Sequence, residues 1–153
     1  MSKKNQKGFT IIEVVLVLAI AGLIFLMVFI ALPNMQAAQR NTQRRNDYNS
    51  LSTQITNYAT NHNGGYPATV MSTWFNSQGT DPDGEPYSTT SVVDKPATAN
   101  TPGRNSNQAY VYKKAVCDTA GNPATGKNKE FVVWGYVEEG AGTAGTYCLS
   151  SHI

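Results

Sequence analysis

The stretch that decides the fold lies at residues 3–32 and reads KKNQKG followed by FTIIEVVLVLAIAGLIFLMVFIAL. A basic stub ends at Gly8, and an apolar run of 24 residues begins at Phe9. That run is long enough to cross a bilayer, which requires about 20 helical residues. It contains one carboxylate, Glu13, and an ionised side chain at membrane depth is costly. Glu13 is therefore expected to have a cationic partner. A free amine at Phe9 of a neighbouring subunit would supply one if the chain is cut after Gly8.

The order of these parts differs from that of a secretory signal peptide. A signal peptide has a basic stub, an apolar stretch of about 7–15 residues and then a small-residue cleavage site. Here the apolar stretch is longer, no such site follows it, and the small residue is Gly8 on the basic side. The three lysines within residues 3–7 favour a cytoplasmic N-terminus by the positive-inside rule, while the arginines within residues 40–45 oppose it.

The segment KGFTIIEVVLVLAIAGLI resembles the class III signal of type IV prepilins and pseudopilins. In that family a basic leader ends in Gly, and Phe, Thr, a hydrophobic pair and Glu follow. The counterparts here are Gly8, Phe9, Thr10, Ile11–Ile12 and Glu13. The resemblance implies that a membrane prepilin peptidase removes residues 1–8, and that the new amine of Phe9 is methylated. It also implies that Glu13 pairs with the Phe9 amine of an adjacent subunit when the pilus assembly machinery builds a filament. The motif covers about the first 35 residues.

The remainder has the size and composition of one small domain. The chain of 153 residues lies near the usual domain size, and 121 residues follow Leu32, enough for one modest core. The formal charge is +2 and becomes −1 once the leader is removed, because nine positive side chains then face ten negative ones. This balance gives no general electrostatic footprint for nucleic acid. A local exception, Arg40, Arg44 and Arg45, is interpreted as a solvated or headgroup-facing helix flank.

Two helical segments are expected in sequence. The first covers residues 9–33 and would cross the membrane or form a filament core; Pro33 is expected to break or kink it. Residues 34–63 contain neither Gly nor Pro and are predicted to form an amphipathic helix that ends at Gly64. Its apolar residues recur at helical spacing and form one stripe that must be buried: Tyr48, Leu51, Ile55 and Tyr58.

Residues 64–153 are predicted to form a globular head whose first part, 64–108, is a loop region rich in Gly, Pro, Ser, Thr, Asn and Asp. The segment YPATVMSTWFNS is expected to hold one helical turn or a short strand, with Trp74 and Phe75 anchoring the long helix. The stretch from Ser88 to Gln108 is expected to be a polar surface connector.

The segment TDPDGEPYS within this region is predicted to form consecutive turns. It resembles the DP-x-G-x-PY loop of major pseudopilins, where a neighbouring loop binds calcium. Asp81, Asp83 and Glu85 offer oxygen ligands to such a hard cation. The full twelve-position calcium loop is absent, and turn chemistry alone also explains these residues. Otherwise no cofactor is expected.

The final part, residues 109–150, is predicted to form a small antiparallel sheet. Three segments have strand character, AYVYKKAVC, EFVVWGYVE and TYCLS, and the connectors between them carry turn signals. About three strands with one apolar face can pack on the stripe of the helix. The expected fold class is therefore α+β, with a long N-terminal helix packed on a small C-terminal sheet.

The only cysteines are Cys117 and Cys148. In a domain outside the cytoplasm they are expected to form a disulfide, worth roughly 3–4 kcal/mol in the chain-entropy model. The alternative is a pair of free buried thiols. The pilin family often carries such a bond in its C-terminal region, whereas major pseudopilins generally do not.

No catalytic motif is visible, and His62 and His152 are interpreted as solvated, so the chain is not expected to be an enzyme. The favoured function is a structural subunit of a type IV pilus, which serves adhesion, twitching motility or DNA uptake. The subunit would reside in the cytoplasmic membrane as a single-pass protein before it joins a homo-oligomeric surface filament. One alternative is a pseudopilin of a type II secretion or competence system. Another is a binding protein for which the apolar segment is only an anchor.

Overall fold

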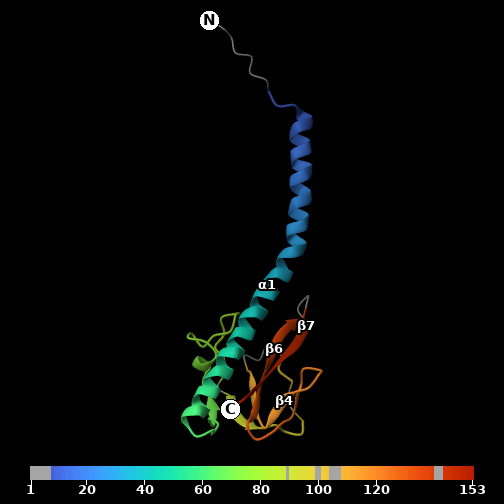
Figure 1. Cartoon of the computed structure of the whole chain (residues 1–153). Helices are drawn as coiled ribbons and strands as arrows, with labels where there is room; N and C mark the ends of the chain where they lie inside the picture. The colour runs from blue at the N-terminus through green and yellow to red at the C-terminus, as the bar shows by residue number, and fades with distance from the viewer. Residues whose placement is uncertain (1–7, 89, 99–100, 104–107, 140–142) are drawn as a thin grey trace. The chain divides into compact units, whose positions relative to one another are not determined.

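The structure is a computed structural model that describes residues 8–88, 90–98, 101–103, 108–139 and 143–153 (Figure 1). The chain divides into two compact units, residues 1–36 and residues 37–153. Helix α1, Ile11–Asn61, contributes to both units and contains 51 residues. Each unit is therefore described by itself.

Helix α1 continues through Pro33, so of the break or kink expected at this residue, the break is wrong. A proline removes one backbone hydrogen bond and crowds the preceding turn, but the residues on both sides are good helix formers. The helix ends where the sequence indicated. Asn63 and Gly64 have positive φ angles of 54° and 80°, and the Gly64 N–H donates to the Ala59 carbonyl at 2.8 Å.

The part of α1 in the second unit buries the predicted stripe. Tyr48, Leu51 and Ile55 are buried, and Phe75 packs edge-on against Tyr48 with ring centroids 6.4 Å apart. Tyr58, which was predicted to complete the stripe, is only half-buried. Ala59 is the buried residue of that turn, four positions after Ile55. The sheet packs on this face, which confirms the α+β class.

The sheet has more strands than the three expected. Five strands form one sheet in the order β1-β2-β3-β6-β7, and β4 and β5 form a separate hairpin. The bounds are β1 Thr69–Val70, β2 Thr90–Asp94, β3 Tyr110–Lys113, β4 Ala115–Cys117, β5 Pro123–Thr125, β6 Glu130–Glu139 and β7 Thr143–His152, with a 3₁₀ turn η1 at Ser72–Trp74.

Two of these differences have identifiable causes. The predicted single strand from Ala109 to Cys117 is divided because Lys114 adopts a positive φ of 54°, which turns the chain between β3 and β4. The predicted connector from Ser88 to Gln108 contains β2, which pairs in parallel with β3 through Val92 and Val111. The sheet is therefore mixed rather than purely antiparallel. The segment YPATVMSTWFNS holds both a short strand and a helical turn, β1 and η1.

The longest pairing joins β6 and β7 (Figure 1), which run antiparallel from Glu130↔His152 to Glu139↔Thr143. Helix α1 lies very close to β6 at Gly135. A Cβ atom added to Gly135 would lie 2.3 Å from Cζ of Tyr48, and the Tyr48 hydroxyl donates to the Tyr136 carbonyl at 2.9 Å. Only a glycine permits this approach.

The opposite face of the sheet is covered by the β4–β5 hairpin, which is joined to β7 by a disulfide between Cys117 and Cys148. The Cys117 N–H also donates to Oγ of Ser150 at 2.7 Å. A second apolar cluster, which includes Tyr112, Val132 and Trp134, lies beneath this hairpin.

Candidate functional site

The N-terminal motif residues lie at the very start of α1. Gly8, Phe9 and Thr10 have no regular secondary structure, and the helix begins at Ile11. The side chain of Phe9 is 88% exposed, and a Cβ atom added to Gly8 would meet nothing within 4 Å. The chain is therefore open on both sides of the predicted scissile bond.

Thr10 and Glu13 cap the helix reciprocally. The Thr10 N–H and hydroxyl donate to Oε2 of Glu13 at 2.9 and 2.8 Å, and the Glu13 N–H donates to Oγ1 of Thr10 at 3.4 Å. This is a capping box, in which two otherwise unpaired helix donors are satisfied. Sequence reasoning assigned Glu13 to assembly and missed this local role. The signal that would have revealed it is the spacing T-x-x-E at residues 10–13.

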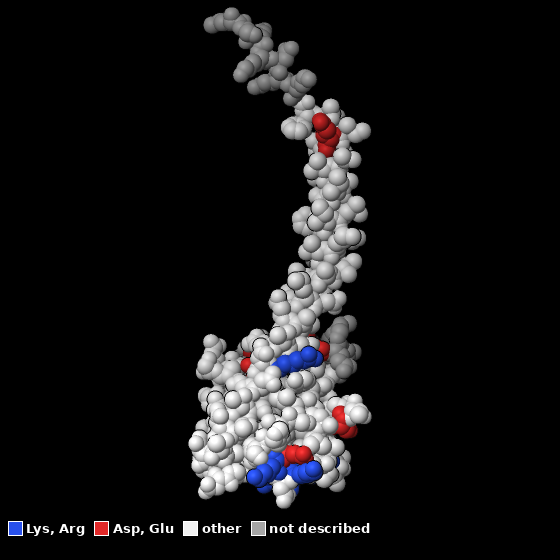
Figure 2. All heavy atoms as spheres, viewed as in Figure 1, with Lys and Arg blue, Asp and Glu red and all other residues white. Residues whose placement is uncertain are grey.

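The side chains of the first unit are almost all exposed. From Gly8 to Gln36 only Ala21 is half-buried, and the exposed positions include Phe25, Met27 and Phe29. On the face shown in Figure 2, this unit carries a single acidic side chain, and Glu13 is the only charged residue between Gly8 and Gln36. Among the described helices, α1 alone is long and apolar enough to cross a membrane. Such a surface requires lipid or other apolar helices around it.

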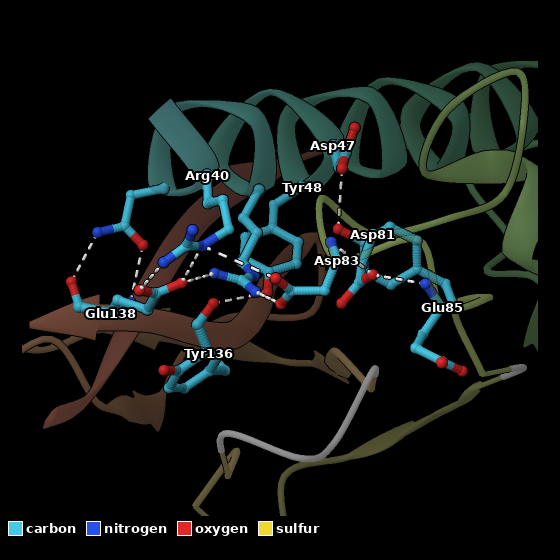
Figure 3. Close-up of polar contacts among 11 residues, drawn as sticks. Arg40, Asp47, Tyr48, Asp81, Asp83, Glu85, Tyr136 and Glu138 are labelled. Carbon is cyan, nitrogen blue, oxygen red and sulfur yellow. Dashed lines mark hydrogen bonds and ion pairs between the residues drawn. The ribbon is translucent and has the colours of Figure 1, made fainter. Parts of the chain in front are cut away.

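The second unit contains a polar cluster where α1 meets the end of β6 (Figure 3). Here it is called the Glu138 cluster, and it consists of Arg40, Asn41, Arg44, Asp83 and Glu138. Arg40 binds Glu138 through two bonds, Nε to Oε1 at 2.7 Å and one terminal nitrogen to Oε2 at 2.8 Å. Arg44 donates to Oε1 of Glu138 at 2.9 Å and also to Asp83. The hydrogen bond from Arg40, followed by that from Arg44, lowers the pKa of Glu138 to about 2.

The arginine flank is therefore not the solvated surface that the sequence suggested. Arg44 is 3% exposed and Arg40 is half-buried, and both are neutralised within the unit. Only Arg45 is exposed, and its guanidinium lies over the ring of Tyr147 at 5.2 Å. The acidic partners lie 39 and 94 residues away from Arg44 in the chain, so no local sequence pattern predicts these ion pairs.

Asn41 completes the edge of β6 at the same place. Its Nδ2 donates to the Glu138 carbonyl at 2.6 Å, and its Oδ1 accepts from the Glu138 N–H at 2.7 Å. Strand β3 pairs with β6 only as far as Trp134, opposite Tyr110. The amide of Asn41 thus occupies the position that a further residue of β3 would take.

Of the three residues named for calcium, Asp81 and Asp83 use their carboxylates for other contacts in this structure, and Glu85 contributes its backbone. Oδ1 of Asp81 accepts from the backbone N–H groups of Asp83 and Glu85 at 3.0 and 2.9 Å, which closes the turn. The carboxylate of Asp83 pairs with Arg44 and lies 3.7 Å from Nε of Arg40. Within the described residues, no three potential metal-binding side chains of His, Cys, Asp or Glu gather in one place. A cation at Asp83 would have to displace an arginine.

One further buried carboxylate escaped the sequence reasoning. Asp47 is 5% exposed, and its Oδ2 accepts the hydroxyl of Tyr87 at 2.8 Å. Burial raises the pKa of Asp47, and the hydrogen bond from Tyr87 partly offsets this. Tyr87 in turn stacks on Phe75 at 4.1 Å, so the loop after η1 is fixed to α1 by both polar and aromatic contacts.

A family model described as the prokaryotic N-terminal methylation motif matches residues 3–29. This motif is the class III signal of type IV pilins and pseudopilins, and the chain combines it with an N-terminal apolar helix. The match covers under a fifth of the chain and supports a pilin-like or pseudopilin-like protein of a structural, non-enzymatic family. The motif implies processing by a prepilin peptidase and assembly into a filament of many subunits. No curated protein and no solved structure matches the chain.

Proposed function

We propose that this chain is a structural subunit of a type IV pilus. The observation that carries the proposal is the combination of the matched motif with an apolar helix surface that bears one carboxylate. The subunit waits in the cytoplasmic membrane as a single-pass protein, with its head outside. It then joins a surface filament whose core is built from the apolar helices.

Processing is the first step of this function. A prepilin peptidase cuts between Gly8 and Phe9, and the amine of Phe9 is then methylated. The exposed, non-helical backbone at residues 8–10 supports this step, because a protease requires an extended and accessible chain around its scissile bond. Removal of the leader also removes three lysines that could not enter an apolar filament core.

Assembly is the second step, and Glu13 directs it. The bonds from Thr10 occupy Oε2 of Glu13, and they leave Oε1 without a bond from Thr10. The amine of Phe9 from an adjacent subunit pairs with that carboxylate. A carboxylate and an ammonium that meet at one depth also fix the axial register of helices that otherwise present only Val, Leu, Ile and Phe to one another.

The pseudopilin of a secretion or competence system remains the second candidate, since the same motif serves it. The disulfide between Cys117 and Cys148 favours a pilin, because the resemblance associates such a bond with pilins rather than with major pseudopilins. The adhesive target and the choice between adhesion, twitching motility and DNA uptake depend on the surface of the assembled filament.

The test begins with the mass of the protein from sheared cell-surface material. A pilus subunit is expected to start at methylated Phe9, and filaments that contain it are expected by electron microscopy. Gly8→Val should leave the leader in place and abolish the filaments, because the peptidase site admits no side chain at that position. Recovery of Met1 or Ser2 from assembled filaments would overturn the proposal. A chain that is cleaved at Phe9 but found only in short periplasmic fibres would indicate the pseudopilin.

A further inference from the structure

The side-chain bonds between α1 and the sheet begin abruptly along the described helix, at Arg40. Arg40, Asn41 and Arg44 lie on adjacent turns, and all three bind Glu138 of β6, through its carboxylate or its backbone. Together they make five hydrogen bonds to that one residue, with lengths from 2.6 to 2.9 Å. Among the described residues of the sheet, no other forms as many side-chain hydrogen bonds with the helix.

The turns just before Arg40 have much weaker support. Pro33 has no N–H to donate to the carbonyl of Phe29, so one helix bond is missing in the turn 29–33, which leads into these turns. Asn34, Met35 and Gln36 are exposed, and only Ala37 among the next three residues is half-buried. An exposed helical turn that lacks a hydrogen bond opens at a small free-energy cost, whereas a turn with buried partners opens only with its surroundings.

We propose that the Glu138 cluster is a clamp that stops unwinding of α1 from passing Arg40. Unwinding begins at Pro33 and spreads through residues 34–39, and it ends where the helix is bonded to Glu138. The segment between Pro33 and Arg40 can then lengthen or rearrange while the head keeps its fold. This device goes beyond the proposed function, and it operates in the single chain whether or not the chain assembles.

The burial of the cluster explains why the clamp holds at this point. Arg44 and Glu138 are 3% and 7% exposed. Opening the helix at Arg44 would leave the Glu138 carboxylate with one partner fewer in a site that water barely reaches. Separating such a buried pair costs far more than separating an exposed one. Asn41 adds a second lock, because its amide must also leave the backbone edge of β6.

Hydrogen exchange followed by mass spectrometry tests the clamp on the full chain in detergent micelles. In the unaltered protein, amides of residues 34–39 should exchange at least tenfold faster than those of residues 42–48. In Glu138→Gln the fast segment should extend to residue 47, while residues 51–59 keep their protection. Asp94→Asn is the matched control, because it removes a carboxylate from an exposed ion pair with Lys114 at 3.6 Å. It should leave the boundary at Arg40.

Trypsin gives an independent reading of the same boundary, since it cuts after Arg40, Arg44 and Arg45 only when the helix opens. Cleavage there should rise at least fivefold in Glu138→Gln and remain unchanged in Asp94→Asn. If Glu138→Gln does not fold, Arg40→Gln replaces it, because that variant keeps the Arg44–Glu138 pair. An unchanged boundary in the variants would overturn the clamp. So would an equal loss of protection from residue 42 to residue 59, since that pattern means general destabilisation of the head.

Discussion

Glu13 and Glu138 are carboxylates of the same helix-and-sheet protein, and the two units hold them in opposite ways. Within the described residues, Glu13 is bonded only to Thr10, three residues earlier, and lies on an exposed apolar helix. Glu138 is buried and bonded to Arg40, Asn41 and Arg44, more than 90 residues away in the chain. The first unit thus exposes its apolar surface and its carboxylate to other molecules, whereas the Glu138 carboxylate is paired within the second unit. An incomplete, apolar surface with one charge is what assembly with other copies requires.

The largest expected effect is the loss of filaments when Glu13, the exposed carboxylate of the first unit, is replaced. Glu13→Ala should abolish filaments, because the amine of Phe9 in an adjacent subunit would then lie without a counter-ion in an apolar core. The membrane-bound monomer should accumulate, and the thermal unfolding of the head should not change. Shearing followed by electron microscopy measures the filaments, and Glu85→Ala in an exposed turn serves as the control. Normal filament numbers in Glu13→Ala would show that Glu13 is not an assembly contact.

The next largest effect is a loss of stability in the second unit. Gly135→Val should destabilise the head by about 3 kcal/mol or more, because a Cβ at Gly135 would lie 2.3 Å from the ring of Tyr48. Urea unfolding of the detergent-solubilised chain measures this loss. Adding Tyr48→Ala should cost less than the sum of the two single variants, since the clash is then gone. Strict additivity would mean that Gly135 and Tyr48 do not limit each other. Cleavage after Gly8 should proceed normally in the single variants.

A smaller effect concerns the disulfide that fastens the β4–β5 hairpin to β7. Cys117 and Cys148 are 31 residues apart in sequence, and a bond closing such a loop contributes about 2–4 kcal/mol. Cys117→Ser with Cys148→Ser should lower the urea midpoint accordingly without affecting the leader cut. Peptide mapping without reductant should recover the linked pair from the natural protein. Two free thiols in protein taken from the cell surface would contradict the bond.

The smallest expected effect is a difference in how two buried carboxylates of the head, Glu138 and Asp47, make its stability depend on pH. The pKa of Glu138 is lowered from 4.5 to about 2, so its stabilising contribution is present above pH 4.5 and is lost as the pH falls toward 2. The pKa of Asp47 is raised by burial, so its ionisation opposes folding and acidification through that pKa relieves the cost.

Urea midpoints measured from pH 6 to pH 2 should therefore change in opposite directions for two isosteric variants. Glu138→Gln should flatten the acid loss of stability, by an amount of about 1–2 kcal/mol over this range. Asp47→Asn should steepen that loss, because the compensating gain is removed. Parallel curves for both variants would show that the two carboxylates do not have the different environments described above.

The same contrast explains which features could be predicted from the sequence. The leader, the apolar helix and the stripe of Tyr48, Leu51 and Ile55 are periodic or contiguous, so local patterns reveal them. The capping box at residues 10–13 is also a local pattern, since its T-x-x-E spacing lies within four consecutive residues, and it was missed. One long N-terminal helix was predicted and is confirmed, but the break considered at Pro33 does not occur, because intact neighbouring turns can bear the cost of a proline.

The missed features depend on partners that are distant in sequence or on a backbone angle that the residue type does not indicate. Strand β2 carries only two adjacent valines, Val92 and Val93, within a polar segment, and its parallel pairing with β3 becomes visible only in the fold. The division between β3 and β4 depends on the backbone of Lys114, a residue type that gives no hint of a positive φ. The Glu138 cluster joins two arginines to Asp83 and Glu138, which come from separate regions of the chain. The spacing of charges along the sequence does not predict such a pairing.

Asn41 has a consequence for the proposed filament, in which copies of this protein would be crowded together. Among the described residues, β3 pairs with β6 only up to Trp134, and an unpaired N–H and carbonyl beyond that point would attract any extended chain and promote aggregation. The amide of Asn41 is hydrogen-bonded to both the N–H and the carbonyl of Glu138, so neither group is available to a strand from another molecule. At this stretch of β6, Glu138 therefore has no free backbone group to offer to a strand of a neighbouring head.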